Sequence, residues 1–95
     1  MSTYLVGDIT VHNPQGYRDY VSQVSHFVAK YQGKYLIRGG DIEVKEGDWH
    51  PERLVIIEFP TQEHAQGFLK DPEYQPVAAI RQATATSNLL LVEGQ

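Results

Sequence analysis

The side chains best suited to chemistry in this 95-residue sequence are two arginines, one carboxylate and one tyrosine, all within apolar segments. Arg38 stands directly before Gly39 and Gly40, inside a segment with strand-like alternation. Glycine within a strand marks either a bulge or a close approach by a ligand or another backbone. The segment therefore has two interpretations. Arg38 binds an anionic or carbonyl group in space left by the glycines, or the glycines form a bulge that bends a long strand.

Arg81 and Tyr74 fall on the stripe of a predicted helix that should face the sheet, together with Val77 and Thr84. An arginine at such a position must be paired, line a cavity or extend its guanidinium group to solvent, because a buried unpaired charge is costly. Two interpretations follow: Arg81 holds a ligand, or its methylene groups simply pack. Tyr74 either adds a hydroxyl group to the same pocket or belongs to the core.

Glu58 shares one face of a predicted strand with Leu54 and Ile56. A carboxylate among aliphatic side chains has a raised pKa, which suits acid–base catalysis, or it is paired with a cation. A third interpretation is that Glu58 reaches solvent at the end of its strand. We take Glu58 and Tyr74 as the candidate catalytic residues.

Trp49 and His50 lie in a predicted hairpin turn. A tryptophan in a turn is either a lid over a cleft or an anchor in a subunit interface. We add both residues to the candidate substrate-binding set, whose other members are Arg38, Gly39, Gly40 and Arg81. No metal site is expected, because the chain has no cysteine and no two histidines have a metal-ligand spacing.

The composition is typical of a soluble globular protein, with 41% hydrophobic and 21% charged residues, and the length suits one domain over residues 1–95. The formal charge of -4, without a cluster of basic residues, argues against nucleic acid or an anionic membrane as partner. No signal peptide and no apolar run of about 20 residues is present. We therefore expect a cytoplasmic protein.

The hydrophobic periodicity predicts strands and helices in the order β-α-β-β-α-β, with the second helical segment split at Pro72. This order is typical of the ferredoxin-like α+β fold, in which helices cover one face of a four-stranded antiparallel sheet. The predicted strands are Thr3–Val11, Lys34 to about Lys45, Leu54–Phe59 and Leu89–Val92, and the predicted helices are Pro14 to about Gln32, a short helix after Thr61, and Pro72 to about Ala85.

The predicted strands are apolar on both faces. Leu54 and Ile56 oppose Val55 and Ile57, whereas a sheet with one wet face would alternate polar and apolar residues. The helices cover only one face, so a second copy of the chain is the expected cover for the other. Such burial contributes on the order of 10 kcal/mol before association costs. The sequence therefore predicts a sheet-to-sheet homodimer.

The segments NPQGYRDY, KYQGKYLIRGG, VKEGDWHPERLVIIEFP, DPEYQPVAAIRQ and LLLVEG occur in this order along nearly the whole chain. As a set they resemble the domain of unknown function 1330 family of the dimeric α+β-barrel superfamily. Thr10 and His50 stand where members of that family often have aspartate and arginine. The resemblance implies a ferredoxin-like monomer and a dimer with facing sheets, but no activity. Other members of the superfamily include cofactor-independent monooxygenases, lactone isomerases and haem-degrading enzymes.

Two functions are compatible with these observations. The first is a small-molecule site for an organic anion or an oxygenated ring, in an isomerase or monooxygenase that needs no metal or organic cofactor. Arg38 and Arg81 would be its cationic side, and Glu58 and Tyr74 its acid–base side. The second is a non-catalytic binding or assembly module in which the arginines are structural.

Overall fold

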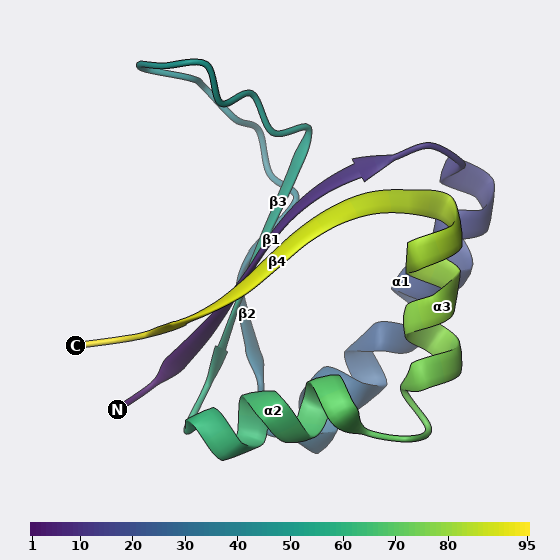
Figure 1. Ribbon diagram of the computed structural model, residues 1–95, viewed down its shortest axis with the longest axis vertical. Coiled ribbons are helices and arrows are strands. Elements are labelled where there is room, and N and C mark those ends of the chain that lie inside the picture. Colours follow the sequence, from purple (N-terminus) through teal and green to yellow (C-terminus); the bar gives the residue numbers. More distant parts are fainter.

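The computed structural model describes residues 1–95 and contains four strands and three helices (Figure 1). The strands form one sheet, and the helices pack against it. Their bounds in chain order are β1 Thr3–Val11, α1 Pro14–Lys30, β2 Lys34–Arg38, β3 Arg53–Phe59, α2 Gln62–Lys70, α3 Gln75–Thr84 and β4 Ala85–Glu93.

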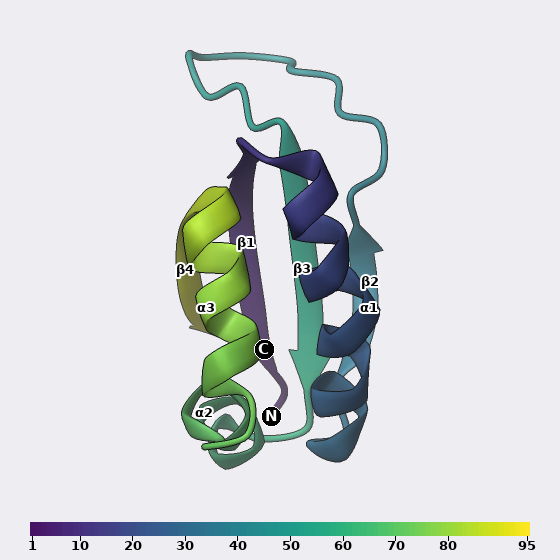
Figure 2. The ribbon, with the colours of Figure 1, turned by 90° about the vertical axis from the view of Figure 1, so that its right-hand side faces the viewer.

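The sheet has the strand order β2-β3-β1-β4, and every neighbouring pair is antiparallel. All three helices lie on one face of the sheet, and the other face has no cover from the chain itself (Figures 1 and 2). The prediction of a ferredoxin-like α+β fold is therefore confirmed.

The first two helices each begin after a capping residue. Asn13 precedes Pro14 and accepts a hydrogen bond from the backbone N–H of Gly16 at 3.1 Å. Thr61 accepts one from the backbone N–H of His64 at 3.2 Å. Each bond satisfies a donor that the first helical turn leaves free. The buried residues of α1 lie on one face of the helix, and they are Tyr17, Tyr20, Val24, Phe27 and Val28.

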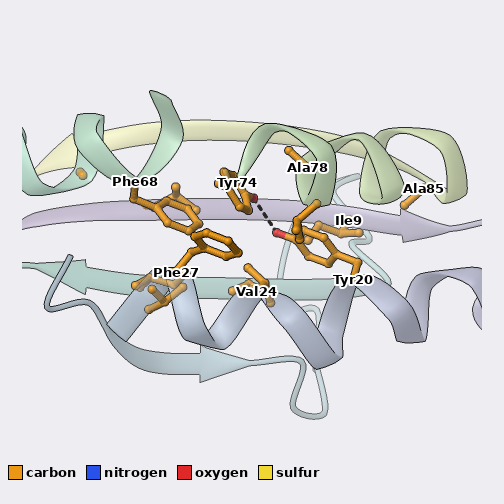
Figure 3. Close-up of a cluster of buried hydrophobic side chains, with 14 of the residues drawn as sticks. Ile9, Tyr20, Val24, Phe27, Phe68, Tyr74, Ala78 and Ala85 are labelled. Atoms are coloured by element: carbon orange, nitrogen blue, oxygen red, sulfur yellow. Dashed lines mark hydrogen bonds between the residues drawn. The ribbon is translucent and has the colours of Figure 1, made fainter. Parts of the chain in front are cut away.

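An aromatic cluster fills the space between the helices and the sheet (Figure 3). Tyr74 stacks against Phe68 with ring centroids 4.5 Å apart and contacts Phe27 at 5.6 Å. Phe68 in turn lies 5.6 Å from Phe59 of β3. Tilted rings at such distances contribute favourable contacts beyond the area they bury. The cluster fixes the position of Tyr74 at the start of α3.

The second strand is shorter than predicted, because it ends at Arg38 instead of near Lys45. Gly39 follows with φ +71°, a conformation that does not continue a strand. Residues 39–52 form an irregular loop that extends beyond the sheet on the side away from the helices (Figure 1). Glu58 of β3 pairs with Lys34, at the start of β2.

The third helix starts later and the last strand starts earlier than predicted. The backbone N–H groups of Glu73 and Tyr74 donate to the Asp71 carboxylate, which forms a turn before α3 begins at Gln75. At the other end β4 begins at Ala85, directly after Thr84, and not at Leu89. The extra strand residues pair with β1, since Ala85 lies opposite Val11.

Asp71 is a buried carboxylate that links the α2–α3 turn to α1. Its Oδ2 accepts hydrogen bonds from Lys30 Nζ at 2.7 Å and from the Tyr31 hydroxyl group at 2.6 Å. These two bonds, Lys30 first, together with the bonds from the backbone N–H groups of Glu73 and Tyr74, hold the pKa of Asp71 well below its usual value of 3.8. Asp71 also raises the pKa of Lys30 through the same bond.

The lowered pKa of Asp71 makes the stability of the fold depend on pH. The unfolded chain takes up a proton at this carboxylate near pH 4, while the folded chain resists it. The contribution of Asp71 to stability is therefore complete above about pH 4 and is lost as the pH falls from there towards its folded pKa.

We expect Asp71→Asn to lower the thermal midpoint at pH 7 by about 5–10 °C. The midpoint of the variant should also fall less steeply below pH 4. Glu73→Gln removes a charge from an exposed neighbour and is the control; equal pH profiles for the two variants would contradict this role.

The uncovered face of the sheet carries an apolar row that crosses all four strands. Ile37 of β2, Ile56 of β3, Val6 of β1 and Leu90 of β4 are consecutive partners in the ladder and so lie on the same face. Leu90 is 54% exposed and Ile37 40% exposed. This row is the feature that the apolar character of both strand faces predicts. No helix in the chain has the length and apolar character needed to cross a membrane.

Candidate functional site

A cavity lies between the sheet and the helices, against the covered face of β1 and β3. It encloses about 490 Å³ when the space open to solvent at its mouth is included, and about 40 Å³ of it is room for the centres of water molecules. One water needs roughly 10–15 Å³ by that measure, so the cavity suits a small ligand. Seventeen residues line it, and the four that are not hydrophobic are Gly7, Arg38, Arg53 and Arg81.

Arg81 reaches the cavity from α3 and is buried, with 6% of its surface exposed. Its Nε has no hydrogen-bond partner. The guanidinium carbon lies 5.7 Å from the ring centroid of Tyr20, a weak cation–π distance. No carboxylate pairs with it, because the two ion pairs of the chain are Lys30–Asp71 and Lys45–Glu43. Arg81 thus lies in the lining of a cavity, which is one of the positions that the sequence allows.

Arg53 is a second arginine of the cavity, and the sequence analysis missed it. It is the first residue of β3 and pairs with Ile9, which places it on the covered face of the sheet. Its Nε is also buried without a hydrogen-bond partner, and its guanidinium carbon lies 5.8 Å from the ring centroid of Tyr17. The alternation of Arg53 with Val55 and Ile57 was a signal that could have found it.

Gly39 leaves the space that the Arg53 side chain occupies. A Cβ atom at Gly39 would overlap the Arg53 Nη1, whereas a Cβ atom at Gly40 would meet nothing within 4 Å. Gly39 also has φ +71°, which disfavours any other residue. Of the two glycines in the candidate set, Gly39 therefore supports the cavity through Arg53, and Gly40 makes no contact with it.

Arg38 lies at the rim of the cavity because of a bulge in β2. Tyr35 pairs with Ile57 and Ile37 pairs with Ile56, so Leu36 is an extra residue in the ladder. Strict alternation would put Arg38 on the uncovered face with Lys34. The bulge instead pairs Arg38 with Val55 on the covered face. The bulge that we predicted at the glycines thus lies three residues earlier, and it brings Arg38 to the cavity.

The Arg38 side chain is exposed and held loosely. Its guanidinium carbon lies 4.3 Å from the ring centroid of Tyr35, and its Nη2 donates to the Val21 carbonyl at 3.4 Å. Burial raises the pKa of Tyr35, although the nearby Arg38 charge lowers it in part. Arg38 therefore keeps most of its donor groups free at the mouth of the cavity.

Tyr20 and Tyr74 form a buried pair of hydroxyl groups 2.9 Å apart (Figure 3). Tyr20 comes from α1, and Tyr74 stands immediately before α3. Burial, followed by the neighbouring Tyr74, raises the pKa of Tyr20 far above its usual value, although Arg81 lowers it in part. The Tyr20 phenol is therefore protonated at neutral pH. The pair can donate one hydrogen bond into the cavity while it keeps its own bond.

Glu58 lies on the opposite face of the sheet from Tyr74, so the structure does not bring these two candidate catalytic residues together. Its partners in the ladder are Tyr4 and Lys34, and the Tyr4 hydroxyl group donates to its Oε2 at 3.3 Å. Residues of one strand alternate between faces, and Val55 and Ile57 occupy the covered face of β3. Glu58 is thus part of the uncovered surface.

Trp49 and His50 also lie away from the cavity, in the loop of residues 39–52. Trp49 is 60% exposed, and its Nε1 donates to Asp8 Oδ2 at 2.8 Å. Asp8 pairs with Leu54 and belongs to the uncovered face. His50 is exposed. The structure therefore does not bring these two candidate residues into the lining of the cavity, because the loop extends away from the helices.

No three histidine, cysteine, aspartate or glutamate side chains gather at one place in the structure. The cavity itself offers guanidinium and phenol groups, which are poor metal ligands. Its groups suit an anion or a polar oxygen, because arginine and tyrosine both donate hydrogen bonds.

The fold and the cavity define a ferredoxin-like α+β protein with cationic side chains between its sheet and helices. The chain belongs to the family described as Domain of unknown function (DUF1330), whose pattern matches residues 2–95. The family resemblance seen in the sequence segments is therefore confirmed. No functionally curated protein matches the chain.

Solved structures share the fold at low sequence identity. A protein of unknown function from Rhodopseudomonas palustris has a TM-score of 0.78 and 18% identity over 99% of this chain and 82% of its own. SnoaB, a cofactor-independent oxygenase from Streptomyces nogalater, has a TM-score of 0.74 and 20% identity over 99% and 93%. A dimeric ferredoxin-like protein of unknown function from Thermobifida fusca has a TM-score of 0.57 and 14% identity over 99% and 92%. At such identities the similarity shows the fold alone.

Proposed function

We propose that the cavity binds a small organic anion or a small oxygenated ring through the guanidinium groups of Arg81 and Arg53. The observation that carries this proposal is the buried Nε of Arg81, which lies in a largely apolar cavity and has no hydrogen-bond partner. A buried donor without a partner is costly, so a fold retains it where a ligand supplies an acceptor. Arg53 adds a second unpartnered Nε to the same lining.

The tyrosine pair gives the site its polar complement. Tyr74 is the one candidate catalytic residue that lines the cavity, and we propose that its hydroxyl group donates a hydrogen bond to an oxygen of the ligand. Such a donor, with two guanidinium groups, would stabilise negative charge that develops on a ligand oxygen. This chemistry suits a cofactor-independent isomerase or oxygenase. The fold shared with SnoaB is compatible with the second.

A matched pair of glycine variants tests the binding proposal. Thermal midpoints are measured with and without a series of small carboxylates and phenols, with benzoate against benzamide as the charged and neutral comparison. A ligand at about 100 times its Kd should raise the midpoint of the parent by about 10 °C. Gly39→Ala should displace Arg53, weaken binding about tenfold and so halve that rise. Gly40→Ala should leave it unchanged. A series without any rise in the parent contradicts the proposal, as does a Gly39→Ala protein with the full rise.

A non-catalytic binding protein remains the second function for the same cavity. Such a protein would bind the same class of ligand as the enzyme but would not convert it. A ligand that raises the midpoint and is recovered unchanged after long incubation with the protein supports this alternative, whereas its conversion supports the enzyme.

We further propose that two copies of the chain pack through their uncovered sheet faces. The apolar row of Ile37, Ile56, Val6 and Leu90 is the supporting observation, because a monomer would leave it in water. A two-fold axis would bring this row onto its copy, which makes the surface self-complementary. The Thermobifida fusca protein of the same fold is dimeric. Trp49 and the exposed Ile42 and Val44 of the loop would border the same interface.

A further inference from the structure

The lining of the cavity contains cations and phenols but no base. Its charged members are Arg38, Arg53 and Arg81, from β2, β3 and α3. Its other titratable members are Tyr17 and Tyr20 from α1, Tyr35 from β2, and Tyr74. No aspartate, glutamate, histidine, lysine or cysteine is among the seventeen lining residues, and α2, β1 and β4 contribute only apolar side chains and Gly7. The lining therefore carries positive charge, and no lining residue supplies a negative charge to balance it.

A phenol group is protonated at neutral pH and is not a base there. Burial raises the pKa values of Tyr20 and Tyr35 above those of ordinary tyrosines, so both keep their protons. Tyr20 is moreover bound to Tyr74 through their hydroxyl groups. Glu58, the one carboxylate in the candidate set, is on the other face of the sheet. A proton on the ligand thus has no acceptor in the cavity.

The arginines favour the ionised form of whatever enters. A charge near a guanidinium group in an apolar surrounding is stabilised more strongly than in water. The same surroundings disfavour a neutral ligand only weakly, since the remaining lining is apolar and aromatic. The difference in binding free energy between the ionised and the neutral form appears as a lowered pKa of the bound ligand.

We infer that the cavity accepts acidic oxygen compounds, phenols, enols and small carboxylic acids, as anions that are already ionised when they bind, and that the protein holds the anion and supplies no base. The inference rests on the proposed function and names its ligand class. A reaction in this site would begin from the anion and would keep its negative charge between Arg81 and Arg53. The proton is released to solvent before binding.

The test uses 4-nitrophenol, whose ionised and neutral forms differ in colour. The apparent pKa of the probe is measured by absorbance with and without saturating protein, and its Kd is measured across the same pH range. We expect a pKa at least one unit lower in the bound probe, which corresponds to at least tenfold tighter binding of the anion. The uncharged ether 4-nitroanisole should bind at least tenfold more weakly than the anion.

Variants and outcomes separate this inference from the proposal of binding. Arg81→Met and Arg53→Met should each reduce the pKa shift of the probe, and the second variant serves if the first does not fold. Arg18→Met, at an exposed position of α1 outside the cavity, should keep the full shift. A probe that binds with an unchanged or raised pKa overturns the inference and leaves binding intact. If neither 4-nitrophenol nor 4-nitroanisole binds, the inference is overturned, and so is the proposed function for single-ring ligands.

Discussion

Arg81→Met should raise the thermal midpoint of the ligand-free protein and at the same time remove its response to ligand. Arg81 is buried, its Nε has no partner and no carboxylate faces it. Replacement of a buried charge by an apolar side chain of similar volume is neutral or stabilising by about 1–4 kcal/mol. For a domain of this size that range corresponds to a rise of roughly 4–30 °C.

The same substitution should weaken the binding of a carboxylate or phenolate at least tenfold, because a hydrogen bond to a charged group contributes about 1.5–3 kcal/mol. The two effects have opposite signs, which a merely structural arginine would not produce. The measurement is a pair of melting curves, with and without benzoate, for the parent, Arg81→Met and the control Arg18→Met. A variant that melts several degrees earlier and responds normally to benzoate would show that Arg81 serves packing alone.

Ile56→Asp should convert a dimer into a monomer. Ile56 lies at the centre of the apolar row on the uncovered face, between Val6 and Ile37 in the ladder. In a symmetric interface the substitution places two carboxylates, one from each copy, into the apolar row. A buried charge without a partner costs about 3–5 kcal/mol for each group, so the dimer should weaken by well over a thousandfold.

Light scattering or sedimentation at micromolar concentration measures this effect as a halved mass. Ala79→Asp is the matched control, because Ala79 is exposed on α3 and receives the same charge on the helical side. It should remain dimeric. A parent protein that is monomeric at this concentration contradicts the proposed interface, and a dimeric Ile56→Asp protein shows that the copies associate elsewhere.

Much of the fold followed from local patterns. The hydrophobic periodicity predicted α1 and α2 close to where the structure has them. The order of elements then limited the topology to the ferredoxin-like sheet, because two right-handed helical crossovers leave few ways to arrange four strands in one antiparallel sheet. The apolar character of both faces of β3 predicted the uncovered row. These features depend on residues close in sequence, which a single chain displays directly.

The candidate site was predicted only in part, because membership of a site depends on faces and registers. Arg81 was found from helical spacing, which is regular over the ten residues of α3, and Tyr74 directly precedes that helix. The face of Glu58 could not be predicted, since the parity within one strand does not tell which face the helices cover. The positions of Trp49 and His50 could not be predicted either, because the irregular loop of residues 39–52 has no period from which its direction follows.

The sequence by itself determined the order of the elements, the fold class and the place of Arg81 on the sheet-facing side of a helix. The tertiary structure decided which side chains meet that arginine. An extra residue at Leu36 turns Arg38 from the uncovered face to the cavity, and Gly39 gives Arg53 the space to lie there. A bulge shifts every later residue of its strand to the other face, and its position is set by pairing with a distant strand. That pairing is a property of the folded sheet, so no local pattern in the chain could have revealed it.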